Sequence, residues 1–89
     1  MDERKALKDL TFYSRHGCPL CEEGFVRAER VAARFGLRVV RVDILSDPEL
    51  LRLHGERVPV VALGGEELIW GRISEKRLLR ELERRLSAG

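Results

Sequence analysis

Residues 10–21 have the sequence LTFYSRHGCPLC, and this stretch decides how the chain begins to fold. Its first five positions hold a β-branched and two aromatic residues, which is typical of a β-strand. Pro19 suits the first position of a helix, because the N–H that proline lacks would have no helical partner there. The stretch therefore predicts a strand, a short loop and the start of a helix, with Cys18 and Cys21 at the junction.

The residues that follow continue the predicted helix. Apolar side chains recur at intervals of three or four residues, which places them on one helical face. These residues are Cys21, Phe25, Ala28, Ala32 and Phe35. Gly36 is a natural stop, since glycine readily adopts the left-handed conformation found just beyond helix ends.

The middle of the chain predicts a second strand and a short helix. Residues 38–44 space three valines and an isoleucine among charged side chains, which favours a strand. Asp47, Pro48 and Glu49 supply a helix cap, a first-position proline and an acid near the positive end of the helix dipole. We expect this helix to finish near Gly55, with His54 as an ordinary helix-end residue.

The last third predicts a hairpin and a final helix. Residues 58–63 and 66–70 are two expected strands, joined by the two-residue turn signal Gly64–Gly65. Ser74 is the expected cap of the last helix. An apolar stripe then lines the buried face of that helix, and it comprises Leu78, Leu82 and Leu86.

The predicted order of elements is β-α-β-α-β-β-α. Two strands joined through a helix imply a parallel pair, and the hairpin adds an antiparallel edge. The sequence thus predicts an α/β fold with a four-stranded mixed sheet and three helices. A length of 89 residues predicts a single domain, residues 1–89, with its core over about 10–87.

Composition narrows the class of protein. Hydrophobic residues make up 44% and charged residues 36%, the balance of a soluble globular domain rather than a disordered one. A net charge of +2, with both signs mixed along the chain, argues against a polybasic arm for nucleic acid or membranes. We expect a cytoplasmic monomer, since the first residues, MDERK, precede no apolar segment of the signal-peptide kind. The absence of Asn and Gln fits a thermophile.

The two cysteines carry the predicted chemistry. A C-x-x-C beside a β-α-β pattern in a cytosolic protein is a redox signature. The reactive species is the thiolate, which the unpaired N–H groups and positive dipole end of a helix N-terminus stabilise. Cys18, at the mouth of the helix, is the expected nucleophile. Cys21, one turn further on the apolar face, is the expected buried, more protonated and resolving thiol.

Two cysteines can also serve other chemistry. A closed zinc site needs four ligands, and only His16 and His54 remain to complete one, so we expect no metal. Haem attachment needs a histidine after the second cysteine, where Glu22 stands. Two alternatives stay open: a copper or iron–sulfur module on the same thiolates, and an adaptor that has lost catalysis and docks through Arg57 and Trp70.

The chain resembles the glutaredoxins, a family with the thioredoxin fold. Residues 13–21 look like the end of that family's first strand, its basic residue and its C-P-x-C site. Val58–Pro59 falls where the family carries a Val-Pro, and residues 70–74 fall where it carries a Gly-Gly turn before the last helix. The likeness is greatest to the small bacterial glutaredoxin-like subgroup.

The resemblance implies a set of binding residues around Cys18. Pro59 would be cis and face Cys18, and the Val58 backbone would pair with an extended substrate. Arg15 would hold a glutathione carboxylate, while free N–H groups at Gly71 and at the helix opened by Ser74 would hold the other.

The implied activity is a dithiol reduction of protein or low-molecular-weight disulfides, with no tightly bound cofactor. The acid that would hold the ammonium group of glutathione is missing, because Ile73 or Ser74 occupies its place. We therefore expect weak use of glutathione and an electron donor of the thioredoxin-reductase type. No nucleic acid or membrane partner is expected.

Overall fold

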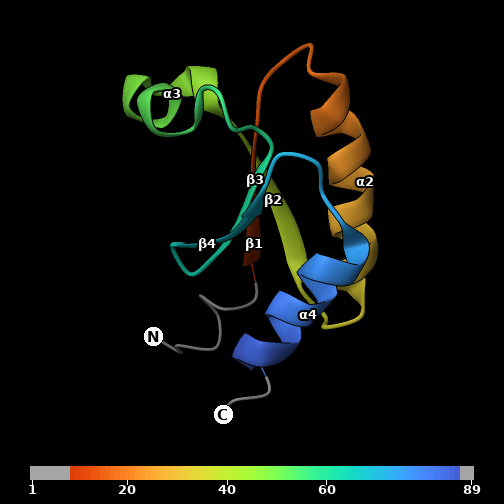
Figure 1. The fold of residues 1–89 in the computed structure, drawn as a ribbon. Helices are drawn as coiled ribbons and strands as arrows, with labels where there is room; N and C mark the ends of the chain where they lie inside the picture. The colour runs from red at the N-terminus through yellow and green to blue at the C-terminus, as the bar shows by residue number, and fades with distance from the viewer. Residues whose placement is uncertain (1–8, 87–89) are drawn as a thin grey trace.

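The computed structural model describes residues 9–86, which form one mixed sheet with helices on both of its faces (Figure 1). The predicted α/β class is confirmed. In chain order the elements are β1 (Asp9–Ser14), α2 (Pro19–Ala33), β2 (Arg38–Asp43), the 3-10 turn η1 (Ile44–Ser46), α3 (Pro48–His54), β3 (Val60–Leu63), β4 (Glu66–Trp70) and α4 (Glu75–Leu86). None of the helices within residues 9–86 has the length and apolar character that a membrane span requires.

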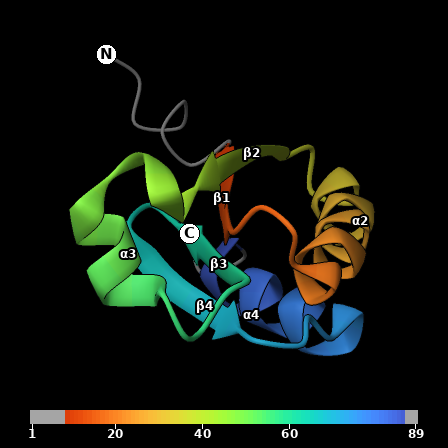
Figure 2. The ribbon, with the colours of Figure 1, turned by 90° about the horizontal axis from the view of Figure 1, so that it is seen from above.

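The four strands are arranged in the order β2-β1-β3-β4. β1 runs parallel to β2, and β3 runs antiparallel to β4, as predicted. β3 also pairs with β1 in the antiparallel direction, which places it beside β1 in the sheet. Seen from above, α2 and α4 cover one face of the sheet and α3 covers the other (Figure 2). Because the sheet lies between these helices, successive residues of β1 meet different helices.

The alternation along β1 shows these two environments. Leu10, Phe12 and Ser14 are buried, and the ring of Phe12 meets Phe25 of α2 edge to face, with 5.3 Å between ring centroids. Tyr13 points to the other face, where its ring stacks on His54 of α3 at 4.6 Å. β1 therefore links the core under α2 to the packing under α3.

The main core lies between the sheet, α2 and α4. Leu78 and Leu82 of α4 are fully buried in it and Leu86 packs at its edge, as the apolar stripe predicted. The strands and α2 contribute the other large members. These include Leu10, Phe12, Cys21, Val31, Val61, Leu63 and Ile69.

Four boundaries differ from prediction. α2 ends at Ala33 and not at Phe35, because the N–H groups of residues 34–36 donate to carbonyls three residues back, which is a tighter turn than an α-helix. β2 ends one residue early at Asp43, because the Asp43 side chain accepts the Leu45 N–H and turns the chain into η1. β3 begins only at Val60, since Pro59 has no N–H to contribute to the sheet. β1 begins at Asp9, one residue before the predicted start at Leu10.

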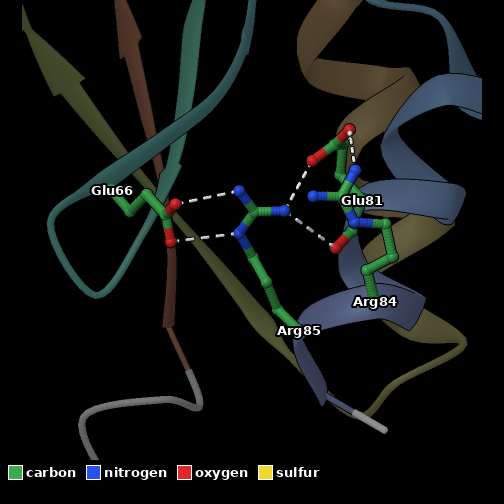
Figure 3. A network of polar contacts seen from close by, with 4 residues as sticks. All are labelled: Glu66, Glu81, Arg84 and Arg85. Atoms are coloured by element: carbon green, nitrogen blue, oxygen red, sulfur yellow. Dashed lines mark hydrogen bonds and ion pairs between the residues drawn. The ribbon is translucent and has the colours of Figure 1, made fainter. Parts of the chain in front are cut away.

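An ionic network joins the end of α4 to the hairpin (Figure 3). Arg85 donates from Nε and Nη2 to the two carboxylate oxygens of Glu66, at 3.1 and 2.9 Å. On its other side Arg85 pairs with Glu81, which also lies 3.6 Å from Arg84. Arg85 thus fastens the last turn of α4 to the first residue of β4.

Candidate active site

Cys18 is the cap of α2, at the predicted mouth of the helix. Its sulfur accepts a hydrogen bond from the Cys21 N–H at 3.1 Å, and its carbonyl accepts the Cys21 and Glu22 N–H groups. The Cys21 N–H is thus shared between the sulfur and the carbonyl of Cys18, in the first turn of α2. The Cys18 sulfur therefore lies at the N-terminal end of α2, where a helix presents outward-pointing N–H groups.

Cys21 lies one turn further along α2 and is fully buried in the core. Burial raises the pKa of its thiol to about 11, and the hydrogen bond with Cys18 adds to the rise. A hydrogen bond from the Arg15 backbone and the charge of Arg41 oppose it. Both cysteines are free thiols, and Cys21 is protonated at neutral pH, as predicted.

The Val58–Pro59 peptide is cis, as the resemblance implied. Tyr13 pairs with Val60, so the loop after β1 and the loop before β3 leave the sheet side by side at one edge. The first of these loops carries Cys18 and the second carries Pro59. The topology therefore brings the C-x-x-C and the cis-proline to the same end of the molecule.

Gly71 does not fulfil its expected role. Its N–H donates to the Pro59 carbonyl at 2.8 Å and to the Arg57 carbonyl at 3.2 Å, closing the end of β4 onto the cis-proline loop. The expectation that this N–H is free to hold a carboxylate is therefore wrong. Gly71, with a φ of 78°, helps to shape the loop instead.

The remaining predicted binding residues lie as follows. Arg15 is exposed, and its side chain makes no hydrogen bond or ion pair with any other residue in the 9–86 range. Val58 is partly buried against the core. Ser74 caps α4, because its hydroxyl accepts the Arg77 N–H at 3.2 Å.

Gly24 is a contributor to the site that sequence reasoning missed. A Cβ at this position would lie 2.8 Å from Cγ1 of Ile73, 3.2 Å from Cγ of Pro59 and 3.4 Å from Cζ of Phe12. Only glycine lets α2 approach the cis-proline loop this closely. The available signal was a glycine in the middle of a predicted helix, where it costs about 1 kcal/mol relative to alanine.

Arg41 is the second residue that sequence reasoning missed. Its Nε donates to the buried hydroxyl of Ser14 at 3.1 Å, its two terminal nitrogens pair with Glu22, and its guanidinium lies 4.8 Å from the Phe25 ring centroid. The Arg41 hydrogen bond holds the pKa of the Glu22 carboxyl below its ordinary value. A pocket of about 350 Å³ opens beside these groups. Its lining comprises Ser14, Arg15, His16, Glu22, Arg41 and Asp43.

The other face of the sheet carries an aromatic and ionic cluster. His54 is buried, and its Nδ1 lies 3.7 Å from Glu67, which also accepts from Arg57 at 2.7 Å. Trp70 is 54% exposed, and the Arg57 guanidinium lies 5.5 Å from its ring centroid. His54 is thus not an ordinary helix-end residue, because α3 packs it against Tyr13.

Metal binding gains no support from the arrangement of ligands. Within the part of the chain that the structure describes, no three His, Cys, Asp or Glu side chains are grouped as metal ligands. A closed zinc site requires four. Cys18 and Cys21 therefore stand as a pair of thiols in this region.

A comparison with known protein families identifies the family of this chain. The model of the glutaredoxin-like domain (DUF836) matches residues 9–83. The chain belongs to this glutaredoxin-like family. Comparison with curated proteins found no match.

Solved structures share the fold of this glutaredoxin-like domain. A protein from X. campestris, structural genomics target XcR50, is 29% identical with a TM-score of 0.72, over 84% of this chain and 96% of that one. Protein Ne2328 from Nitrosomonas europaea is 28% identical with a TM-score of 0.65, over 88% and 94%. Thioredoxin 1 from Thermosipho africanus shares the fold at 17% identity, with a TM-score of 0.66 over 89% and 94%. The family is glutaredoxin-like, and the two nearby cysteines are consistent with a redox function.

Proposed function

We propose that this glutaredoxin-like domain is a cytoplasmic, monomeric thiol–disulfide oxidoreductase that reduces protein or small-molecule disulfides through Cys18 and Cys21. One observation carries the proposal: a partly exposed sulfur accepts a hydrogen bond at the N-terminus of α2, and a second, fully buried thiol lies one turn behind it. The partly exposed Cys18 is suited to attack a substrate disulfide, and the buried Cys21 is suited to react in the second step.

The reaction has two exchanges. The Cys18 thiolate attacks one sulfur of the substrate disulfide, forming a mixed disulfide on Cys18 and releasing the first substrate thiolate, which takes up a proton. Cys21 then loses its proton, and its thiolate attacks the Cys18 sulfur. The second substrate thiol leaves, a Cys18–Cys21 disulfide remains, and two electrons have passed to the substrate. An external thiol or reductase restores the dithiol.

The test is a disulfide-reduction assay with two variants. Cys18→Ser should abolish reduction, because no nucleophile remains at the helix mouth. Cys21→Ser should accumulate a mixed disulfide on Cys18, visible by mass spectrometry as one substrate half attached to the protein. Retained activity in Cys18→Ser would refute the mechanism. Stoichiometric copper or iron in the anaerobically purified protein, without disulfide reduction, would support the metal-binding alternative instead.

Glutathione is expected to be a poor electron donor. Arg15 offers a guanidinium that can hold a carboxylate with two hydrogen bonds, but the Gly71 N–H is already paired. Among the described residues near the expected place of the ammonium group, Ile73 is buried and the Glu75 carboxylate already pairs with Arg30 at 2.6 Å. Loss of one charge-assisted hydrogen bond costs about 1.5–3 kcal/mol, roughly a tenfold to hundredfold loss of affinity.

The donor is identified by reducing the oxidised protein in two parallel assays. One contains glutathione, glutathione reductase and NADPH, and the other contains a thioredoxin reductase and NADPH. We expect faster reduction in the second. Rapid turnover at submillimolar glutathione would show that Arg15, Val58 and the start of α4 suffice without the acid.

A further inference from the structure

We propose that Arg41 is a positioning residue for the second exchange: its guanidinium favours the thiolate of Cys21, and Glu22 limits this effect by pairing with Arg41. The inference rests on the proposed function, because it concerns one step of that reaction. It adds a residue outside the C-x-x-C that sets how quickly the mixed disulfide is resolved.

The first support is the place of Arg41 in the fold. Arg41 lies on β2 opposite Phe12 of β1, and Phe12 is buried in the same core cluster as Cys21. Its contacts on α2 are Glu22, directly after Cys21, and Phe25, one turn later. The guanidinium is therefore held along the turn of α2 that carries Cys21.

The second support is how firmly the guanidinium is held. Its Nε donates to Ser14, whose side chain is buried at the end of β1. Only 34% of the Arg41 side chain is exposed, so its charge is less screened than that of a free surface arginine. A fixed, partly desolvated charge acts more strongly on a neighbouring titratable group than a mobile, hydrated one.

The third support is the electrostatic balance around Cys21. Burial and Cys18 raise the pKa of the Cys21 thiol, whereas the Arg15 backbone and the charge of Arg41 lower it. Arg41 is in turn paired with Glu22, whose carboxylate is also stabilised by the charge of His16. Asp43 lines the same pocket. Arg41 is thus the residue of β2 whose positive charge acts on Cys21.

The two members of the pair should act in opposite directions. Arg41→Gln removes the charge that favours the Cys21 thiolate and should slow the second exchange. Glu22→Gln leaves Arg41 without its counter-charge and should speed that exchange. The charge of Arg41 is one of several influences on Cys21, so we expect the rate changes to stay within about tenfold.

The experiment separates the two exchanges with a neutral probe. Reduced protein is mixed with one equivalent of 2,2′-dithiodipyridine, and the release of thiopyridone is followed by stopped flow. The first equivalent reports attack by Cys18 and the second reports resolution by Cys21; Cys21→Ser should release only the first. A wild-type protein that releases no thiopyridone would contradict the proposed function itself, whereas the role of Arg41 is judged from the second phase alone.

The expected result is specific to the second phase. Arg41→Gln should slow it and move its pH profile to higher pH, Glu22→Gln should do the reverse, and Arg41→Lys should restore most of the wild-type rate. The matched control is Arg38→Gln, which removes an equal charge from the same strand but from a 74% exposed side chain paired with Asp9. It should leave both phases unchanged.

Two outcomes would overturn the inference. One is an Arg41→Gln second phase with the same rate and pH profile as Arg38→Gln. The other is a Glu22→Gln second phase slower than that of the wild type. If Arg41→Gln does not fold, Glu22→Gln and Arg41→Lys still decide, because both keep a cation on β2.

Discussion

At the scale of single residues, Cys18 and Cys21 differ in chemistry because they differ in solvent access and hydrogen bonding. Cys18 lies at the end of α2, partly exposed, with an N–H donor on its sulfur. Cys21 lies in the core, where burial raises the pKa of its thiol to about 11. One turn of helix thus places two identical side chains, three residues apart, in different environments.

The raised pKa of Cys21 predicts a loss of stability in alkali. A thiol whose folded pKa exceeds its ordinary value of 9.0 stabilises the fold below that value, and this contribution is lost as pH rises through about 11. We expect the free energy of unfolding of the reduced protein to fall by about 1–3 kcal/mol over this window.

The measurement is urea unfolding at a series of alkaline pH values. Cys21→Ala should be less stable overall, because it leaves a cavity, but its stability should decline less steeply with pH. Equal slopes in the two proteins would show that Cys21 ionises in the folded state as readily as in the unfolded chain.

At the scale of elements, the position of α2 depends on Gly24, which has no side chain. Gly24 brings the helix against Pro59 and Ile73, so that the helix carrying both cysteines packs beside the cis-proline loop. A longer side chain at position 24 would separate these two parts of the site. Gly24 weakens the interior of α2, because glycine is unfavourable in a helix. What it provides is the close packing of α2 against the cis-proline loop.

Gly24→Ala is therefore expected to destabilise the protein despite the better helix propensity of alanine. Alanine gains about 1 kcal/mol in propensity, but its Cβ would lie 2.8 Å from the buried Ile73 Cγ1. Overpacking of this kind costs about 1–3 kcal/mol. Thermal unfolding should show a lower Tm.

The control for this prediction removes the opposing atom. In an Ile73→Ala background the overlap is relieved, and Gly24→Ala should cost less or become stabilising. A Tm increase from Gly24→Ala in the wild-type background would mean that the loop yields to the new methyl group.

At the scale of the whole molecule, charged groups join both edge strands of the sheet to the helices that cover one of its faces. Arg41 connects β2 to β1 and α2, and Arg85 connects α4 to β4 (Figure 3). Exposed ion pairs contribute little singly. Their geometry nevertheless predicts a response to acid, because each carboxylate gains from its partner only while it is charged.

Glu66 gives a measurable case. The Arg85 hydrogen bond holds the pKa of Glu66 below its ordinary 4.5, so its stabilising contribution is present above that value and lost as pH falls through the lowered pKa. The Tm of Glu66→Gln should therefore fall less than the Tm of the wild type between about pH 5 and pH 3.

The matched control is Glu56→Gln, since the Glu56 side chain has no ion pair or hydrogen bond to any residue in the 9–86 range. This variant should keep the acid sensitivity of the wild type. An identical acid profile for Glu66→Gln would show that the contact with Arg85 contributes nothing to folding.

The sequence by itself determined the order of the elements, most of their ends and the position of the cysteine pair. Helix caps, a first-position proline and a two-residue turn depend only on adjacent residues, so they can be predicted from the sequence. These residues are Asp47, Ser74, Pro19 and Gly64–Gly65. The depth of Cys21 also followed from local periodicity, because a residue three positions into an amphipathic helix falls on its apolar face.

Only the tertiary structure decided what surrounds the cysteines. Arg41 and Ser14 are 27 residues apart in the chain, and Gly24 meets Pro59 and Ile73 across the fold. The Gly71 N–H is paired because the cis-proline loop passes beside it. His54 is buried because α3 packs against the sheet. These contacts arise from how the elements pack, and no local pattern records which distant partner a side chain will meet.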